Sequence, residues 1–242
     1  MDTSAKIVFV GSGSLRCCAP VFAGIFNCWW QPDSMLYLVD TNEERLDLSE
    51  RLARCFAAES RSNLRVTTDS MEASLKDATH VVLAFGLGHY GEEDEEIDLL
   101  QAWCVLNGIQ LPEREHAETS KEERLDFMRA ILLNPIFEEV NQLLPNLARN
   151  ALVVNLVRPV ELTAPLLAVE AIHLDWPEAL SQEERLPLAH QILRWIRSEE
   201  YLGGELLKNT QNPIVNALKY GEPKPENRFN PKALAGYLAR LT

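Results

Sequence analysis

The stretch Lys6–Ser14, which reads KIVFVGSGS, is a run of apolar residues followed by two glycines, Gly11 and Gly13. An apolar run of this length that stops at a glycine predicts a buried strand, and the residues from Ser14 to Asn27 have the composition of a helix. Strand, glycine-rich turn and helix in this order can hold a dinucleotide, because the free N–H groups at the helix start attract phosphate.

The same alternation of short apolar runs and longer amphipathic segments continues along the chain. Strands are predicted at 6–11, 35–40, 64–68, 79–85, 151–155 and 171–176, and helices at 14–27, 42–60, 71–76, 92–106, 121–147 and 161–169. Parallel neighbours need a crossover connection, so this order indicates an α/β protein with a Rossmann-like, doubly wound, mostly parallel sheet. We expect it to form a dinucleotide-binding domain over residues 1–176.

The character of the sequence changes after residue 176. Residues 177–197 and 202–218 have helical spacing of apolar residues, and Pro231 opens a last predicted helix. We expect 177–242 to form a C-terminal helical appendage packed on the sheet. A dimerisation element is the alternative, and the sequence leaves a homo-oligomer open.

Composition excludes several classes of partner. The chain is 46% hydrophobic and 24% charged, which is enough to bury a core, and its 36 acidic and 23 basic residues give a net charge of −13. Nucleic acid and anionic membranes repel such a chain, so we expect neither as a partner. The partner we expect, if the protein has one, is a small-molecule substrate. No run approaches the ~20 apolar residues of a membrane helix. The five cysteines have no zinc-ligand spacing and indicate reduced thiols in a cytoplasmic protein.

The loop after the first strand supplies most of the predicted cofactor contacts. Gly11 permits the tight turn, and Gly13 lets the backbone approach a pyrophosphate. Ser12 and Ser14 complete the loop before the helix start. Arg16 replaces the third glycine of the usual fingerprint and is positioned to touch a phosphate.

Asp40 ends the second strand, 27 residues after Gly13. A carboxylate there accepts hydrogen bonds from the adenosine ribose and repels a 2′-phosphate. The next residues, Thr41 and Asn42, supply no cation, so NAD is favoured over NADP. The alternative is that the glycines only turn the chain and Asp40 caps the following helix.

Several further segments carry a family resemblance. They are Leu38–Asp40 with Glu44–Leu46, Thr67–Asp69 with Glu72 and Ala73, Asp77 and Ala78, Asp94 and Glu95 with Ile97, Glu118 and Thr119 with Arg129, and Asn155–Pro159 with Thr163. Together with Lys6–Ser14 they resemble the NAD-dependent family 4 glycoside hydrolases, relatives of lactate and malate dehydrogenases. The resemblance covers about residues 6–175 and implies the fold and NAD as the cofactor.

The chain also departs from that family. Family members are longer and carry a second, substrate-binding domain that has no counterpart in these residues. Arg158 stands where the family has an asparagine before proline, Ser120–Arg124 replaces a glycine-rich segment, and the metal-binding cysteine after the sixth strand is missing. The resemblance therefore does not carry over glycosidase activity.

Ligands in such sheets lie beyond the carboxyl ends of the strands. There, Gly86 and Asn155 are expected to face the cofactor, and His89 or Tyr90 could act as a general acid or base. Arg158 could clamp a carboxylate or phosphate, or simply pair with Glu161.

His173 and Asp175 share one face of the last strand. His173 is a candidate for proton transfer, and the pair could also bind a metal. The alternative is two polar residues on the wet face of an edge strand, and we assign no metal ligands.

The sequence leaves three functions open. The first is an NAD(H)-binding Rossmann protein that works as a reduced oxidoreductase. The second is a non-catalytic family member that binds NAD as a sensor or interaction protein. The third is an empty scaffold that binds no nucleotide.

Overall fold

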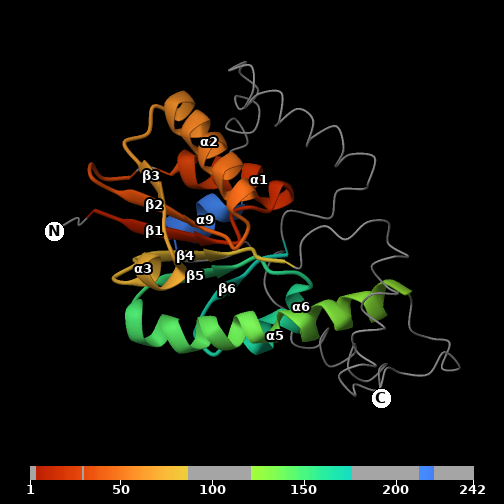
Figure 1. The fold of residues 1–242 in the computed structure, drawn as a ribbon. Helices are drawn as coiled ribbons and strands as arrows, with labels where there is room; N and C mark the ends of the chain where they lie inside the picture. Colours follow the sequence, from red (N-terminus) through yellow and green to blue (C-terminus); the bar gives the residue numbers. More distant parts are fainter. Residues whose placement is uncertain (1–3, 29, 87–120, 176–212, 221–242) are drawn as a thin grey trace, which may run out of the picture.

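A computed structural model describes residues 4–28, 30–86, 121–175 and 213–220. They form a parallel sheet of six strands in the order β3-β2-β1-β4-β5-β6 (Figure 1). The strands are β1 (Lys6–Val10), β2 (Met35–Val39), β3 (Arg65–Thr68), β4 (His80–Leu83), β5 (Leu152–Asn155) and β6 (Ile172–His173). This order confirms the predicted doubly wound sheet.

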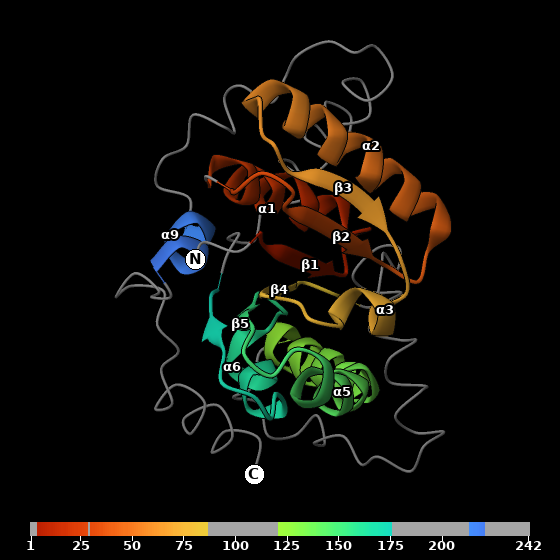
Figure 2. The ribbon, with the colours of Figure 1, turned by 90° about the vertical axis from the view of Figure 1, so that its left-hand side faces the viewer.

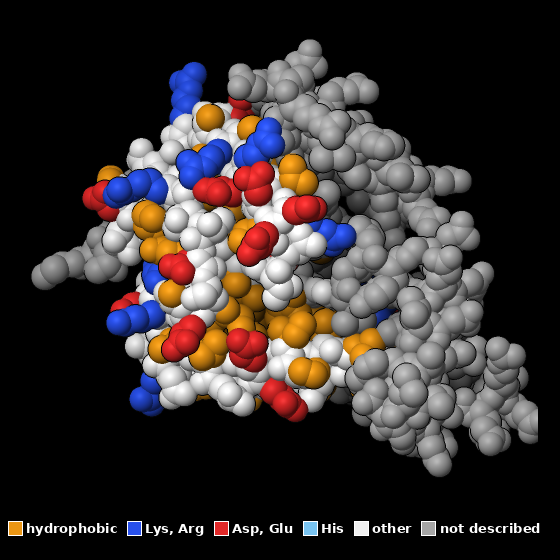
Figure 3. Space-filling view, in the orientation of Figure 1, with side chains coloured by type: hydrophobic (Ala, Val, Ile, Leu, Met, Phe, Trp, Pro, Cys, Tyr) orange, Lys and Arg blue, Asp and Glu red, His pale blue; other side chains and the backbone are white. Residues whose placement is uncertain are grey.

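Helices cover both faces of the sheet. They are α1 (Leu15–Asn27), α2 (Glu43–Ser60), α3 (Met71–Leu75), α5 (Lys121–Leu147), α6 (Val160–Thr163), the 3₁₀ turn η1 (Ala164–Leu166) and α9 (Pro213–Tyr220). Figure 2 shows α1, α2 and α9 on one side and α5 and α6 on the other. In the view of Figure 3, charged side chains are spread over the described surface, and hydrophobic ones gather above α5.

Strand β1 explains why the opening apolar run is continuous. Ile7 and Phe9 belong to the core beneath α1 and α2, and Val8 and Val10 belong to the core beneath α5. Successive side chains of a strand point to opposite faces, so a central strand covered on both sides has to be apolar at every position.

Three predicted elements are clearly shorter in the structure than expected. The strand predicted at 79–85 is reduced to β4 (His80–Leu83). The helix predicted at 161–169 ends with η1 at Leu166, because Asn141 of α5 holds the next backbone groups. Its Nδ2 donates to the Leu166 carbonyl at 2.8 Å, and its Oδ1 accepts from the Ala168 N–H at 2.8 Å. The strand predicted at 171–176 is reduced to the two residues of β6, which pair with Val154 and Asn155 at the end of β5.

Helix α9 is the described part of the predicted appendage. It lies against α1 and β5, and its buried residues Ile214, Ala217 and Leu218 belong to the core beneath α1 and α2. The helices predicted at 92–106, at 177–197 and from Pro231 lie outside the described residues, and the domain division at 176 stays a prediction. None of the described helices is long and apolar enough to span a membrane.

Candidate functional site

The carboxyl ends of the parallel strands meet at one edge of the sheet. The loops after β1 and β2 belong to one half of this edge, and those after β4, β5 and β6 belong to the other. The strand order reverses between β1 and β4. Open α/β sheets bind ligands at such a switch point, so this edge is the candidate site.

Gly11 makes the turn that follows β1. Its φ is +85°, a conformation that side-chain-bearing residues rarely adopt. Its N–H donates to the Val39 carbonyl at 2.9 Å. A Cβ at this position would collide with the Phe85 backbone and lie 2.7 Å from the carbonyl carbon of Ala84. The first glycine is therefore required by both the turn and the close approach to the end of β4.

Gly13 is in direct contact with Asp40. The Gly13 N–H donates to Asp40 Oδ2 at 2.8 Å, and a Cβ on residue 13 would lie 2.7 Å from Asp40 Cγ. The other carboxylate oxygen, Oδ1, accepts from the Asn42 N–H at 2.9 Å. The cap of α2 that the sequence also allowed for Asp40 is Asn42, whose Oδ1 accepts from the Arg45 N–H at 3.0 Å. Asp40 thus joins the glycine loop to the start of α2.

The serines of the loop are part of its support. Ser12 is fully buried, and its carbonyl accepts from Ser49 Oγ of α2 at 2.8 Å. Ser14 precedes α1, and its carbonyl accepts the N–H groups of Cys17 and Cys18. Arg16 lies in the first turn of α1. The ligand contacts expected of these residues remain predictions.

Arg45 is a neighbour of this loop that the sequence reading missed. Its Cβ would lie only 3.0 Å from a Cβ placed on Gly13. A cation-bearing side chain therefore starts beside Asp40, although Thr41 and Asn42 carry no charge. The signal was the helix start: a cap at Asn42 places Arg45 in the first turn, whose residues face back toward the preceding loop.

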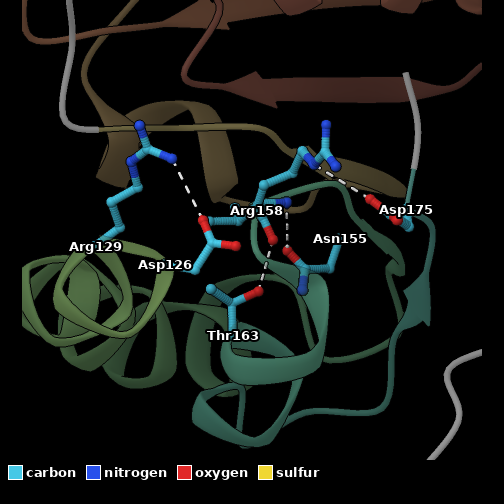
Figure 4. A network of polar contacts seen from close by, with 7 residues as sticks. Asp126, Arg129, Asn155, Arg158, Thr163 and Asp175 are labelled. Atoms are coloured by element: carbon cyan, nitrogen blue, oxygen red, sulfur yellow. Dashed lines mark hydrogen bonds and ion pairs between the residues drawn. The ribbon is translucent and has the colours of Figure 1, made fainter. Parts of the chain in front are cut away.

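Asn155 fixes the loop that follows β5. The side chain is fully buried, its Oδ1 accepts from the Val157 N–H at 3.1 Å, and its Nδ2 lies 3.2 Å from Nδ1 of His173. Thr163 of α6 adds a second anchor, because its hydroxyl donates to the Val157 carbonyl at 2.6 Å (Figure 4). The structure thus gives Asn155 a positioning role, and its cofactor contact stays a prediction.

Arg158 extends from this fixed loop toward the end of β6. Its Nε lies 3.2 Å from Oδ1 of Asp175, and the side chains are 34% and 51% exposed. Its carboxylate partner is therefore Asp175, not the Glu161 that the sequence offered. On α5, Arg129 Nη1 lies 3.3 Å from Asp126 Oδ1, and the guanidinium groups of Arg129 and Arg158 both point upward in the view of Figure 4.

His173 and Asp175 have different contacts in the structure: His173 contacts Asn155, and Asp175 pairs with Arg158. Partial burial lowers the pKa of His173 from its usual value of 6.5, which favours a neutral ring at pH 7. Among the residues that the structure describes, no three His, Cys, Asp or Glu side chains are grouped to hold a metal ion. The metal alternative that the sequence offered for His173 and Asp175 stays a prediction.

The remaining predicted residues lie after β4. Gly86 is exposed, and a Cβ placed on it would meet no atom within 4 Å. His89 and Tyr90 lie outside the described residues. Their proposed acid–base roles stay predictions.

The chain was compared with a family model, with curated proteins and with solved structures. The family model described as family 4 glycosyl hydrolase matches residues 6–173. No curated protein sequence matches the chain. Among solved structures, a 6-phospho-α-glucosidase from gut microorganisms in complex with NAD and Mn²⁺ has a TM-score of 0.50 at 13% sequence identity. The match covers 71% of this chain and 38% of the glucosidase chain.

Two further structures have lower scores. A 6-phospho-β-glucosidase from Thermotoga maritima with NAD and glucose-6-phosphate has a TM-score of 0.43 at 20% identity, covering 64% of this chain and 34% of its own. A lactate dehydrogenase from Eimeria maxima with NADH and oxamate has a TM-score of 0.39 at 14% sequence identity. The match covers 72% of this chain and 44% of the dehydrogenase chain. The chain thus spans less than half the length of these structures.

Proposed function

Because this chain belongs to the family 4 glycosyl hydrolases, we propose that its Rossmann-like sheet binds NAD(H), with the pyrophosphate on the Gly11–Ser14 loop and the adenosine ribose on Asp40. The observation that carries the proposal is the contact between Gly13 and Asp40. It places a carboxylate 2.8 Å from the amide of a glycine that has no room for a side chain. Ribose hydroxyls can donate to this carboxylate while the start of α1 faces the phosphates.

The choice between NAD and NADP follows from the charges beside this loop. The negative charge of Asp40 opposes a 2′-phosphate, and Arg45 starts close enough to weaken that opposition. We expect NADH to bind more tightly than NADPH. We also expect Asp40→Asn to narrow or reverse the difference between the NADH and NADPH affinities. The substitution removes the repulsion between Asp40 and the 2′-phosphate and leaves the positive charge of Arg45.

Two activities are compatible with such a site. One is an NAD-dependent oxidoreductase that uses the loops after β4, β5 and β6 for its substrate. The other is NAD binding without turnover, and one observation favours it: at the edge where a substrate would lie, Asn155 contacts His173 and Arg158 pairs with Asp175. Turnover would require His173, His89 or Tyr90 to face the nicotinamide, whereas binding alone would tolerate changes to them.

The experiment is a calorimetric titration of the metal-stripped protein with NAD, NADH, NADP and NADPH. The wild type is compared with Asp40→Asn and with Asp47→Asn, a matched control that is exposed on α2. We expect NADH binding that Asp40→Asn weakens at least tenfold and that Asp47→Asn leaves unchanged. A ligand at ~100 times its dissociation constant adds about 2.7 kcal/mol of stability. The melting temperature should then rise by roughly 5–10 °C.

Two results would contradict this function. Binding of none of the four dinucleotides would exclude both NAD-dependent activities. Equal loss of binding in the two variants would show that the Asp40 carboxylate has no specific part in it. If NADH binds, NADH-dependent reduction of a panel of carbonyl compounds then separates the activities: an oxidoreductase reduces at least one of them and loses this activity on substitution of His173, His89 or Tyr90, whereas a sensor reduces none.

A further inference from the structure

We propose that Arg158 is an oxyanion-binding residue, and that a carboxylate or phosphate group of a small ligand exchanges with Asp175 on its guanidinium. The inference rests on the proposed function only for the identity of the neighbouring cofactor. The anion would bind at the half of the sheet edge formed by the loops after β4, β5 and β6, opposite the glycine loop. Asp175 would then act as an internal competitor that occupies the guanidinium when no ligand is bound.

The backbone that carries Arg158 is held firmly. Asn155 is fully buried and binds the Val157 N–H, and Thr163 binds the Val157 carbonyl at 2.6 Å. The residue just before Arg158 is therefore anchored through both of its backbone polar groups. An anchored backbone keeps the base of the Arg158 side chain in place, which reduces the ordering cost of binding a ligand.

The contact with Asp175 is of a kind that a ligand can displace. It joins Nε to one carboxylate oxygen at 3.2 Å, and about a third of the Arg158 side chain and half of the Asp175 side chain are exposed. Exposed ion pairs contribute about 0.2–1 kcal/mol. A guanidinium carries five N–H donors in a fork that matches carboxylate and phosphate oxygens, so an anion that binds two of them replaces the contact with a stronger one.

The proposal predicts opposite effects for the two partners of the ion pair. Neutralising Asp175 removes the competitor and one negative charge, whereas neutralising Arg158 removes the donor and one positive charge. A purely structural ion pair has no such asymmetry, because losing either partner breaks the same contact.

The test is an anion titration at constant ionic strength, with acetate as the carboxylate probe and inorganic phosphate as the phosphate probe. Binding is followed by NMR at the backbone amide resonances, which every variant retains, with and without NADH. The variants are Arg158→Gln and Asp175→Asn. Arg54→Gln and Glu50→Gln form the control pair, since Arg54 and Glu50 make a comparable exposed ion pair on α2 at 2.6 Å.

We expect Asp175→Asn to tighten binding of at least one probe by up to about fivefold, the equivalent of ~1 kcal/mol. Arg158→Gln should weaken it at least tenfold, and the control pair should leave it unchanged. The probe that binds more tightly identifies carboxylate or phosphate as the ligand group. Thermal unfolding of each variant checks that it is folded.

Weaker binding in both variants of the pair, or no binding of either probe to the wild type and Asp175→Asn, would overturn the inference. The arm without NADH keeps it separate from the proposed function. Opposite effects of the two variants in that arm support the anion site even if NADH does not bind. NADH binding without any anion response leaves the cofactor proposal intact and removes this one.

Discussion

Replacing Gly11 by alanine tests the turn on which the candidate site depends. The wild-type residue has a φ of +85°, and the added Cβ would collide with the backbone of Phe85 and lie 2.7 Å from the carbonyl carbon of Ala84. Neither neighbour is the end of a flexible side chain. Both belong to the segment that continues β4, so relief requires the loop or the end of the sheet to move.

The expected cost has two parts. A left-handed conformation costs an ordinary L-residue about 1–2 kcal/mol. Forcing extra volume into a packed region costs about 1–3 kcal/mol. We therefore expect Gly11→Ala to lower the free energy of unfolding by about 2–5 kcal/mol. For a chain of this length each 1 kcal/mol corresponds to about 2–4 °C, so the melting temperature should fall by roughly 4–20 °C.

The assay is urea unfolding followed by circular dichroism, supported by a thermal scan. The control is Gly86→Ala, where the same methyl group meets no atom within 4 Å, and its free energy of unfolding should stay within about 0.5 kcal/mol of the wild type. Equal stability of Gly11→Ala and Gly86→Ala would refute the claim that the first glycine is required by the turn and by the approach to β4.

Other parts of the structure give three further predictions. Thr163→Val removes the 2.6 Å hydrogen bond to the buried Val157 carbonyl, and urea unfolding should show a loss of about 1–3 kcal/mol; no loss would mean that the loop has another anchor. Phe22→Ala empties a fully buried site packed against three phenylalanine rings, so the same assay should show a loss of about 3–5 kcal/mol; a loss below 1 kcal/mol would contradict this packing. Burial lowers the pKa of His80 and His173 from 6.5, so below that pH the unfolded chain binds more protons and stability should fall as pH decreases. Urea midpoints at pH 7.5 and 5.5 should show this fall, and His80→Gln should reduce it; an unchanged difference would remove His80 as a cause.

The sequence was sufficient for the parts of the fold that depend on local pattern. The apolar run of β1 has no polar face because both sides of the strand are buried, and the amino-acid sequence shows this pattern directly. Gly11 and Asp40 were also predictable, since each directly follows a strand and the strand ends of a parallel sheet meet at one edge.

The sequence was not sufficient where a contact depends on how separate elements pack. Asn141 on α5 binds the Leu166 carbonyl and the Ala168 N–H and so ends the helix after β5. The sequence around residue 166 does not indicate this contact. Helical spacing pairs Arg158 with Glu161, but the structure pairs it with Asp175, on the neighbouring chain segment after β6. Arg45 lies beside Gly13 because of how α2 packs on the glycine loop, which the two residues next to Asp40 do not show.

The central claim is that the loop after β1 and the acid after β2 bind NAD(H). Hydrogen–deuterium exchange of the wild-type protein with and without saturating NADH tests it most directly, because it reports the location of binding as well as its occurrence. We predict slower exchange at the amides of residues 11–18 and 40–45, at both ends of the Gly13–Asp40 contact. NADH binding that leaves these two segments unchanged, or that slows exchange only elsewhere, would contradict the account.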